Sequence, residues 1–374
     1  MDQKNKVMTI KQRLFIVTYI PSPYQVELFN GIADKNYWDL YIVYIYPKSN
    51  DSLSRFWQAP ELCHSYIILD DDIENYATAE SVMNAADLVI FNYYQHPASR
   101  QMIERRANSQ KAWCFWGERT GYRQLGWLGY HYRKWKLSTL HRSNVPIWGI
   151  GNWAVEQYRR EFGSYRQYFN IPYFSNLNRF SLSRDTNYFN KESRCFLYSG
   201  SLIHRKGVDL LASAFSQLAD EFPFVKLTIM GEGNLRSWLE KQLARYRERV
   251  QFLGFQSWED LPNFYKAADI LCVPSRYDGW ALVVPEGLAS GLPVIGTNRT
   301  GAALELIANN KNGWLITANN KEALYQAMRQ ATLLSSTQLQ ERSQAAQMSV
   351  YQHSLTQGVN RFNHAIEETL RICQ

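Results

Sequence analysis

Short runs of β-branched and aromatic residues alternate with stretches of helical periodicity along most of this chain of 374 residues. The runs that predict strands are residues 13–19, 41–46, 66–69, 88–92, 112–116, 196–200, 225–230, 250–255, 270–274 and 293–296. Helices are predicted by apolar residues spaced three or four apart, at Val26, Phe29 and Ala33 after Pro23, at Val208, Leu211, Phe215 and Leu218, and at Val359, Phe362, Ile366 and Leu370. This alternation is typical of parallel sheets covered by crossover helices, so we expect an α/β fold.

The length of the chain and a change of texture near Pro172 predict two domains. Domains cluster at roughly 100 to 200 residues, so this chain exceeds one ordinary core. Residues 181–193 are polar and lack apolar periodicity, which is typical of a linker. We expect a first α/β domain at residues 1–176, a linker at 177–194, a second α/β domain at 195–350 and a terminal helix at 351–374.

The apolar runs are too short to cross a membrane, which takes roughly 20 apolar residues. The longest run near the N-terminus, residues 14–20, ends at Pro21 and lacks the small-residue cleavage site of a secretory signal. The five cysteines lack a Cys-x-x-Cys pair or metal-spaced histidines. We therefore expect reduced, mostly buried thiols, no metal site and a cytoplasmic protein; the cysteines are Cys63, Cys114, Cys195, Cys272 and Cys373.

Residues 275–296 read SRYDGWALVVPEGLASGLPVIG and carry the most informative chemistry of the chain. The turn Asp278-Gly279 leaves backbone N–H groups at the start of the next helix free to bind a phosphate or sugar hydroxyls. Glu286, eight positions after Asp278, can accept two hydrogen bonds from a vicinal diol such as a ribose. Loops at the carboxyl ends of parallel strands bind ligands in open α/β sheets, so a site is expected here.

This segment resembles the retaining glycosyltransferases of family 4, which have the GT-B fold. An acid, seven residues, a glutamate and a Gly-x-Pro-Val-Ile strand mark that family, and Asp278, Glu286 and residues 291–295 match them. Further matches lie upstream at Gly200 and at residues 205–209, 230–233, 252–254 and 268–269. The resemblance implies two Rossmann-like domains facing each other across a cleft. Residues 1–176 would bind the acceptor and residues 195–350 the nucleotide-sugar donor, with the C-terminal helix packing back toward the first domain.

The resemblance also implies roles for the matching residues. Arg205 and Lys206 would neutralise the donor diphosphate without a metal ion, Glu286 would hold the ribose, and Asp278 would act on the transferred sugar. No cofactor is implied beyond the nucleoside-diphosphate sugar, which is the donor substrate. The donor-binding set is Ser201, Arg205, Lys206, Gly231, Gly254, Gly279, Trp280, Ala281, Leu282 and Glu286. Asp278 is one methylene shorter than the family's usual glutamate, and Ser201 replaces a frequent arginine, so the sugar contacts are expected to differ.

The N-terminal half departs further from the family pattern. The sequence Pro21-Ser22-Pro23-Tyr24 replaces the glycine-rich turn after the first strand, and no residue matches the usual catalytic histidine. Glu118 instead follows a predicted strand at about the right place. It is interpreted either as a catalytic group facing the acceptor, acting as a base or by positioning, or as part of a surface salt bridge.

Basic and aromatic residues alternate in residues 119–142, within a chain of formal charge +7. Such a stretch can bind anionic lipid, track single-stranded nucleic acid, or form a solvated helix. Given the donor motifs, we favour an anionic membrane surface or an acceptor surface and expect no nucleic-acid partner. The residues of this surface are Arg123, Trp127, Arg133, Lys134, Trp135 and Lys136.

The sequence as a whole predicts a hexosyltransferase-like enzyme that acts on a glycan or lipid-linked acceptor at the inner face of a membrane. Two alternatives come from neighbouring classes. One is a GT-B nucleotide-sugar epimerase or phosphorylase, and the other is a catalytically silent protein that binds nucleotide sugars.

Overall fold

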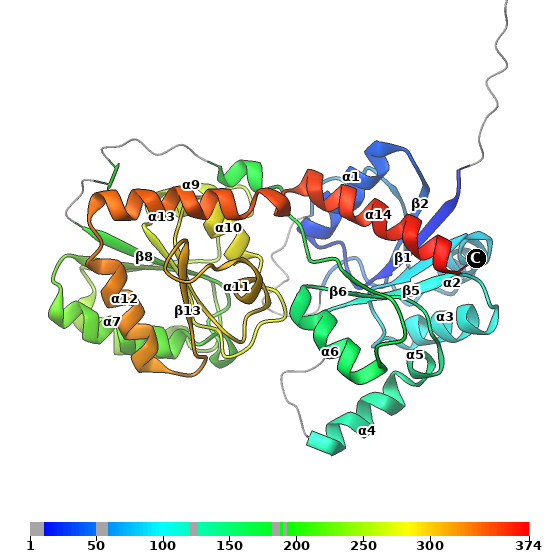
Figure 1. Ribbon diagram of the computed structural model, residues 1–374, viewed down its shortest axis with the longest axis horizontal. Coiled ribbons are helices and arrows are strands. Elements are labelled where there is room, and N and C mark those ends of the chain that lie inside the picture. Colours follow the sequence, from blue (N-terminus) through cyan, green and yellow to red (C-terminus); the bar gives the residue numbers. More distant parts are fainter. Residues whose placement is uncertain (1–10, 50–58, 120–125, 182–187, 190–192, 374) are drawn as a thin grey trace, which may run out of the picture.

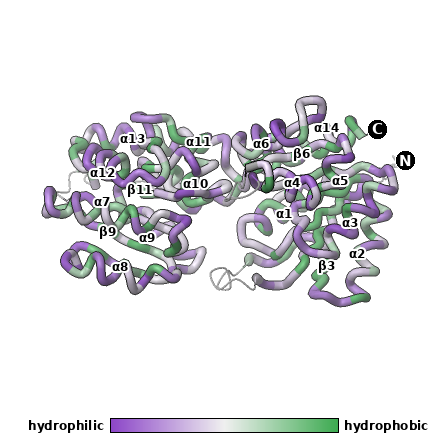
Figure 2. Tube along the Cα trace, turned by 90° about the horizontal axis from the view of Figure 1, so that it is seen from below, coloured by the Kyte–Doolittle hydropathy of each residue, from purple (hydrophilic) through white to green (hydrophobic). Residues whose placement is uncertain are grey.

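The computed structural model describes residues 11–49, 59–119, 126–181, 188–189 and 193–373. These residues form two α/β lobes, each built on one parallel sheet with helices on both faces (Figure 1). Figure 2 shows the lobes side by side and joined through a narrower middle. The predicted fold of two Rossmann-like α/β domains is confirmed.

The N-terminal lobe contains a 7-stranded sheet in the order β3-β2-β1-β4-β5-β6-β7. Its strands are β1 (Arg13–Thr18), β2 (Asp39–Tyr44), β3 (Ser65–Ile68), β4 (Leu88–Phe91), β5 (Trp113–Gly117), β6 (Ile147–Gly149) and β7 (Tyr168–Asn170). Its helices are α1 (Pro23–Lys35), α2 (Ile73–Ala85), α3 (Pro97–Asn108), α4 (Gly126–Lys136), α5 (Ser138–Arg142) and α6 (Asn152–Phe162). Because helices cover both faces, central strands such as β4 are apolar throughout and do not alternate.

The C-terminal lobe contains a 6-stranded sheet in the order β10-β9-β8-β11-β12-β13. Its strands are β8 (Arg194–Ser199), β9 (Val225–Met230), β10 (Val250–Gly254), β11 (Ile270–Val273), β12 (Val294–Thr297) and β13 (Gly313–Ile316). Its helices are α7 (Val208–Glu221), α8 (Arg236–Gln242), α9 (Leu261–Ala267), α10 (Val283–Ala289), α11 (Gly301–Leu306), α12 (Lys321–Thr332) and α13 (Ser336–Ser349). Short 3-10 helices are η1 (Leu177–Phe180), η3 (His204–Lys206), η4 (Ala244–Tyr246) and η5 (Tyr351–His353). The strand order reverses between β8 and β11, and such switch points are where open sheets bind ligands.

The last helix, α14 (Leu355–Cys373), returns to the N-terminal lobe and lies on α1 (Figure 1). Its Phe362 ring lies between those of Trp116 and Trp148, at centroid distances of 5.2 and 5.1 Å. The indole of Trp148 also donates a hydrogen bond to Thr369 at 3.1 Å. The predicted packing of the C-terminal helix against the first domain is thus confirmed. The physical reason is that the apolar face of α14 is buried against the N-terminal lobe.

Direct contacts also join the two lobes near the sheets. Glu305 of α11 accepts hydrogen bonds from the backbone N–H of Asn152 and from the side chain of Asn170, both at 2.8 Å. A Cβ atom on Gly151 would lie 2.7 Å from the Trp280 ring, so the two lobes touch there without room for a side chain. These contacts bring the carboxyl ends of the two sheets to the same junction.

Within the segment predicted as a linker, Leu177 and Phe180 are buried. Two sequence expectations need correction. Strands β6, β7 and β13 were not predicted, because runs of three or four residues are too short to show a period. The expectation of mostly buried thiols is wrong, since Cys63 is exposed and only Cys114 and Cys272 are buried. The domain limits at residues 176 and 195 stay a prediction.

Candidate active site

The loops that follow β8 and β11 lie side by side, because these two strands are neighbours in the second sheet. A Cβ atom on Gly207 would lie 2.0 Å from the carbonyl oxygen of Pro274. Gly207 also has a φ of 70°, which glycine adopts at little cost. This close approach brings the predicted diphosphate-binding pair, Arg205 and Lys206, against the loop that carries Asp278.

Lys206 and Asp278 form an ion pair between these two loops. The guanidinium of Arg205 donates a hydrogen bond to the carbonyl oxygen of Tyr277 at 3.0 Å. The backbone N–H of Asp278 donates to the carbonyl oxygen of Arg299 at 2.9 Å, which anchors the loop on the segment after β12. The site therefore holds two cations and one carboxylate in a frame of backbone hydrogen bonds.

The turn into α10 has an uncommon backbone conformation. Ala281 has a φ of 72°, which non-glycine residues rarely adopt and which is often found at functional sites. Gly301 packs against this turn so closely that a Cβ atom would lie 2.2 Å from the carbonyl oxygen of Gly279. The surrounding chain thus fixes the loop that runs from Gly279 through Leu282.

Glu286 of α10 lies in the interior of the C-terminal lobe and is 1 % exposed. Its Oε2 accepts a hydrogen bond from the hydroxyl of Tyr265 at 3.2 Å, whereas within the described residues its Oε1 has no partner. Burial raises the pKa of Glu286 to about 8, and the charge of Arg179 only partly opposes this rise. A buried carboxyl oxygen without a partner is costly, so it indicates a place for a ligand hydroxyl or a water molecule.

Glycines at the ends of β8, β9 and β10 bring three backbone segments together. The N–H of Gly231 donates to the carbonyl oxygen of Gly254 at 2.7 Å. A Cβ atom on Gly231 would lie 2.0 Å from the carbonyl oxygen of Gly200. Ser201 is held beside them, because its carbonyl oxygen accepts a hydrogen bond from Tyr198 at 2.7 Å. These predicted donor-binding positions therefore lie at one edge of the sheet.

The N-terminal lobe places Glu118, which follows β5, directly opposite the loop that runs from Gly279 through Leu282. A Cβ atom on Gly279 would lie 2.2 Å from Glu118 Oε2, so a carboxylate of one lobe meets the backbone of the other. Part of Glu118 is open to solvent, yet the protein packed around it and the charge of Asp278 raise its pKa to about 7, against the opposing charge of Lys206. A carboxyl group with this pKa can take or give a proton at neutral pH.

Two tyrosines beside Glu118 were missed by the sequence analysis. The rings of Tyr24 and Tyr173 lie 4.7 Å apart. Burial raises the pKa of both hydroxyls, and the charge of Glu118 adds to the rise. Tyr24 belongs to the sequence that replaces the family's glycine-rich turn and lies at the start of α1, and this replacement was its only signal. Tyr173 gave none.

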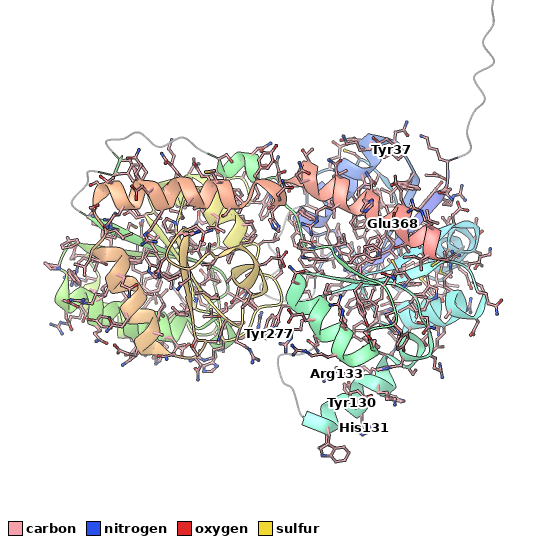
Figure 3. All side chains as sticks on the ribbon, viewed as in Figure 1. Tyr37, Tyr130, His131, Arg133, Tyr277 and Glu368 are labelled. Carbon is pink, nitrogen blue, oxygen red and sulfur yellow. The ribbon has the colours of Figure 1, made fainter. Side chains whose placement is uncertain are left out.

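Several predicted site residues lie elsewhere. The Trp280 ring is buried at the lobe junction, with its centroid 6.2 Å from that of His353, so the ring serves packing. Arg123 lies outside the described residues. Arg133 pairs with Glu161 at 3.0 Å and is therefore not a free cation. The remaining surface residues lie on α4, which projects from the lower edge of the N-terminal lobe, well below Tyr277 in Figure 3; they are Trp127, Lys134, Trp135 and Lys136.

Residues 180–348 match the family described as Glycosyl transferases group 1. An uncharacterized glycosyltransferase of Methanocaldococcus jannaschii is 30% identical over 135 residues, which cover 36% of this chain and 34% of that protein. A GDP-mannose-dependent monoacylated alpha-(1-6)-phosphatidylinositol monomannoside mannosyltransferase of Corynebacterium glutamicum is 28% identical over 168 residues, which cover 41% of this chain and 44% of that protein. The chain thus spans less than half the length of these relatives.

The likeness in three dimensions extends over both lobes. The crystal structure of Anabaena Alr3699/HepE in complex with UDP superposes with a TM-score of 0.75 at 14% identity, covering 96% of this chain and 100% of that one. The same protein has been solved with UDP-glucose. At this identity the likeness defines the fold, and the sequence match lies in the second lobe. Residues 180–348 therefore resemble the glycosyl transferases group 1, and the two lobes together have the GT-B fold.

Proposed function

We propose that this chain is a retaining, metal-independent glycosyltransferase that moves a hexose-like sugar from a nucleoside diphosphate to a glycan or lipid-linked acceptor. One observation carries the proposal. The buried Glu286 has a carboxyl oxygen without a partner among the described residues, and it lies in α10, the helix that follows the loop in which Asp278 pairs with Lys206. The relatives support a nucleotide-sugar donor, since one is GDP-mannose-dependent and the Anabaena protein was solved with UDP.

The contacts among these residues suggest how a donor would bind to the proposed donor domain, residues 195–350. The ribose hydroxyls would donate hydrogen bonds to Glu286. Arg205 and Lys206 would bind the diphosphate through charge-assisted hydrogen bonds, and Lys206 would leave Asp278 to do so. Asp278 would then be free to accept hydrogen bonds from the hydroxyls of the transferred sugar. The glycines Gly231 and Gly254 would let the nucleobase approach the backbone.

The transfer step needs a group for each charge that develops. The bond from the sugar C1 to the diphosphate oxygen breaks, and its electron pair goes to the phosphate, which Lys206 and Arg205 stabilise. A bond forms between C1 and the acceptor oxygen, on the face that the phosphate leaves, so configuration is retained. The proton of the acceptor hydroxyl goes to Glu118, whose pKa of about 7 suits a general base.

A panel of UDP-, GDP-, ADP- and dTDP-sugars tests the proposal by thermal shift. A ligand at 100 times its dissociation constant stabilises a protein by about 2.7 kcal/mol, so one nucleotide class should stand out. The Glu286→Gln variant should lose most of this shift, whereas a Glu74→Gln control on the exposed surface of α2 should keep it. If no nucleotide sugar raises the unfolding temperature of the wild type, the proposal is wrong.

Chelation is expected to leave turnover intact. Arg205 and Lys206 supply the positive charge that other enzymes obtain from a divalent cation, and Asp278 is paired with Lys206. Nucleoside diphosphate release should be measured with and without an excess of EDTA. Activity that disappears in EDTA and returns with Mg²⁺ or Mn²⁺ would contradict the metal-independent assignment.

The exposed face of α4 supports peripheral binding to an anionic membrane. Trp127 and Trp135 are each 71% exposed, and Lys134 and Lys136 extend from the same helix. Aromatic rings with adjacent cations are typical of helices that lie in a bilayer interface. None of the helices in the described ranges has the length and hydropathy that crossing a membrane requires. We propose that α4 lies on the lipid surface that would carry a lipid-linked acceptor.

Replacing Lys134 and Lys136 together by glutamine should weaken binding to phosphatidylglycerol vesicles about tenfold or more. Each lysine near an anionic surface contributes about 1 kcal/mol at low salt, and this attraction is screened within a Debye length. Arg133 should be left unchanged because it holds Glu161. Sedimentation with vesicles measures the binding, and the exposed pair Lys241→Gln and Lys266→Gln is the control. Wild-type protein that ignores these vesicles at low salt would refute a membrane role for α4.

A further inference from the structure

Two arginines from different lobes meet on one aromatic ring at the lobe junction. The guanidinium carbon of Arg119 lies 4.0 Å from the centroid of the Trp153 ring, and that of Arg299 lies 5.8 Å from it. The Tyr277 ring closes the group, with its centroid 5.6 Å from that of Trp153. Tyr277 lies between the two lobes in Figure 3. We call these four residues the junction cluster.

The positive charge of the junction cluster is not neutralised by the described residues. Within them, Arg119 Nε and Nη1 and Arg299 Nε are buried without a hydrogen-bond partner. Burial lowers the pKa of Arg119, and the charge of Arg299 lowers it further, while Tyr277, which shares a side-chain hydrogen bond with Arg119, opposes this fall. Both side chains are half-buried, and buried guanidinium nitrogen atoms are normally hydrogen-bonded, since an unpaired donor is costly to bury.

Glu118 directly precedes Arg119, but its carboxylate lies against Gly279 and does not pair with the Arg119 guanidinium. Two further nearby carboxylates are already engaged. Glu305 accepts hydrogen bonds from Asn152 and Asn170, as described above. Asp278 pairs with Lys206. Since these carboxylates bind other groups, the arrangement favours an external anion. A phosphate fits best, because guanidinium groups bind its oxygens in a bidentate manner and an aromatic ring beneath them keeps them in place.

The cluster lies beside the proposed donor site and is distinct from it. The Tyr277 hydroxyl donates a hydrogen bond to the carbonyl oxygen of Arg119 at 3.0 Å, so the two segments run next to each other. Side chains of neighbouring residues in extended chain point to opposite sides. The Tyr277 ring faces the Arg119 guanidinium, whereas the next residue, Asp278, pairs with Lys206. In the other lobe, Arg119 directly follows Glu118 in the chain. A ligand at the cluster would thus lie one residue away from the group proposed to face the acceptor.

We propose that the junction cluster binds a phosphate group of the acceptor, so that the acceptor substrate is a phosphate ester. The reacting hydroxyl would lie at Glu118 and the phosphate between Arg119 and Arg299. That the phosphate belongs to the acceptor rests on the proposed function, whereas the anion site itself does not. The phosphate can belong to a soluble sugar phosphate or to a lipid headgroup, and both present the same charged oxygens.

Calorimetry on the full chain tests the site, with the donor site first saturated by the nucleoside diphosphate that the panel identifies. Glycerol 3-phosphate should then bind at one further site. Arg119→Gln and Arg299→Gln should each weaken this binding at least tenfold and change nucleoside diphosphate affinity less than twofold. Arg247→Gln, an exposed arginine of the C-terminal lobe, should behave as wild type. Sedimentation with phosphatidic acid vesicles forms the second arm, and tighter binding there that depends on Arg299 would assign the phosphate to a lipid.

Two results would overturn the anion site. One is nucleotide-loaded wild type that binds neither glycerol 3-phosphate nor phosphatidic acid vesicles. The other is phosphate binding that survives in both Arg119→Gln and Arg299→Gln. Either result leaves nucleotide binding, and with it the proposed function, standing. Protein that binds glycerol 3-phosphate through these arginines but binds no nucleotide would support the anion site and refute the proposed function instead.

Discussion

Replacing Glu118 by glutamine is expected to slow nucleoside diphosphate release from the donor by about 10²- to 10⁴-fold, the usual contribution of a general base. Glutamine keeps the shape of the side chain opposite Gly279 but cannot accept a proton. The lobes should therefore remain in place, and nucleotide affinity should change little. Transfer of the sugar to water also releases nucleoside diphosphate, so this rate can be measured even before the natural acceptor is identified.

The pH dependence of kcat/KM tests the same role of Glu118. The pKa of Glu118 is raised to about 7, so the carboxyl is protonated below this pH and cannot act as a base. At low donor concentration, kcat/KM of the wild type should fall as pH decreases through about 7, because this ratio reports groups of the free enzyme. The fall through about 7 should be absent from Glu118→Gln, which should keep only the fall through about 8 that comes from Glu286. The Glu74→Gln control should show both. A Glu118→Gln variant with wild-type rate at pH 7.5 would refute the assignment.

Replacing Glu286 by glutamine should weaken nucleoside diphosphate binding by about 1.5 to 3 kcal/mol, or roughly 10- to 150-fold, through loss of charge-assisted hydrogen bonds. The contact is made in both ground and transition states, so mainly KM should rise. Burial raises the pKa of Glu286 to about 8, so its carboxylate is fully formed only above that pH. Below it, the wild type must first release a proton at a cost of about 1.4 kcal/mol per pH unit. The difference between wild type and variant should therefore be larger at pH 8.5 than at pH 6.5.

The Asp278→Asn variant should behave differently in kind. Asparagine releases Lys206 from its ion pair, so nucleoside diphosphate affinity should stay equal or increase. The transferred sugar would lose its charged partner, and a small misplacement of a reacting group can cost about 10²-fold in kcat. Calorimetry with the nucleoside diphosphate alone, run on both variants, separates the two roles. Should Asp278→Asn lose affinity as strongly as Glu286→Gln, the proposed division of labour is wrong.

The sequence was most informative where function depends on one continuous segment. The spacing of Asp278 and Glu286 and the Gly-x-Pro-Val-Ile strand pointed to the C-terminal domain, and residues 180–348 match the glycosyl transferases group 1. Gly207 and Gly231 could be placed near ligand-binding loops because only glycine tolerates such close backbone contacts. Strands of four or more buried residues, such as β9 at Val225–Met230, were also predicted within a residue or two of their observed ends.

Predictions were weaker where a residue acts through partners that are distant in sequence. The charged and aromatic residues of α4 could be recognised in the sequence. The Arg133–Glu161 pair could not, because it joins residues 28 apart and no spacing rule indicates it. Trp280 was assigned to the donor loop through its backbone amide, and the packing of its ring at the lobe junction had no signal in the sequence. Buried thiols were overestimated because burial depends on which loop covers a residue, and Cys63 lies in a loop before β3.

The sequence by itself determined the α/β class, the two-domain order and the donor-loop motif, because period and local spacing are properties of contiguous residues. Only the tertiary structure placed Glu118 opposite Gly279, gave Glu118 and Glu286 their raised pKa values, and brought Arg119 together with Arg299 on the Trp153 ring. These features depend on the distance between side chains of different lobes and on how much protein surrounds them. Both quantities are set by the packing of α14 and α11 against the N-terminal lobe, which no local pattern encodes.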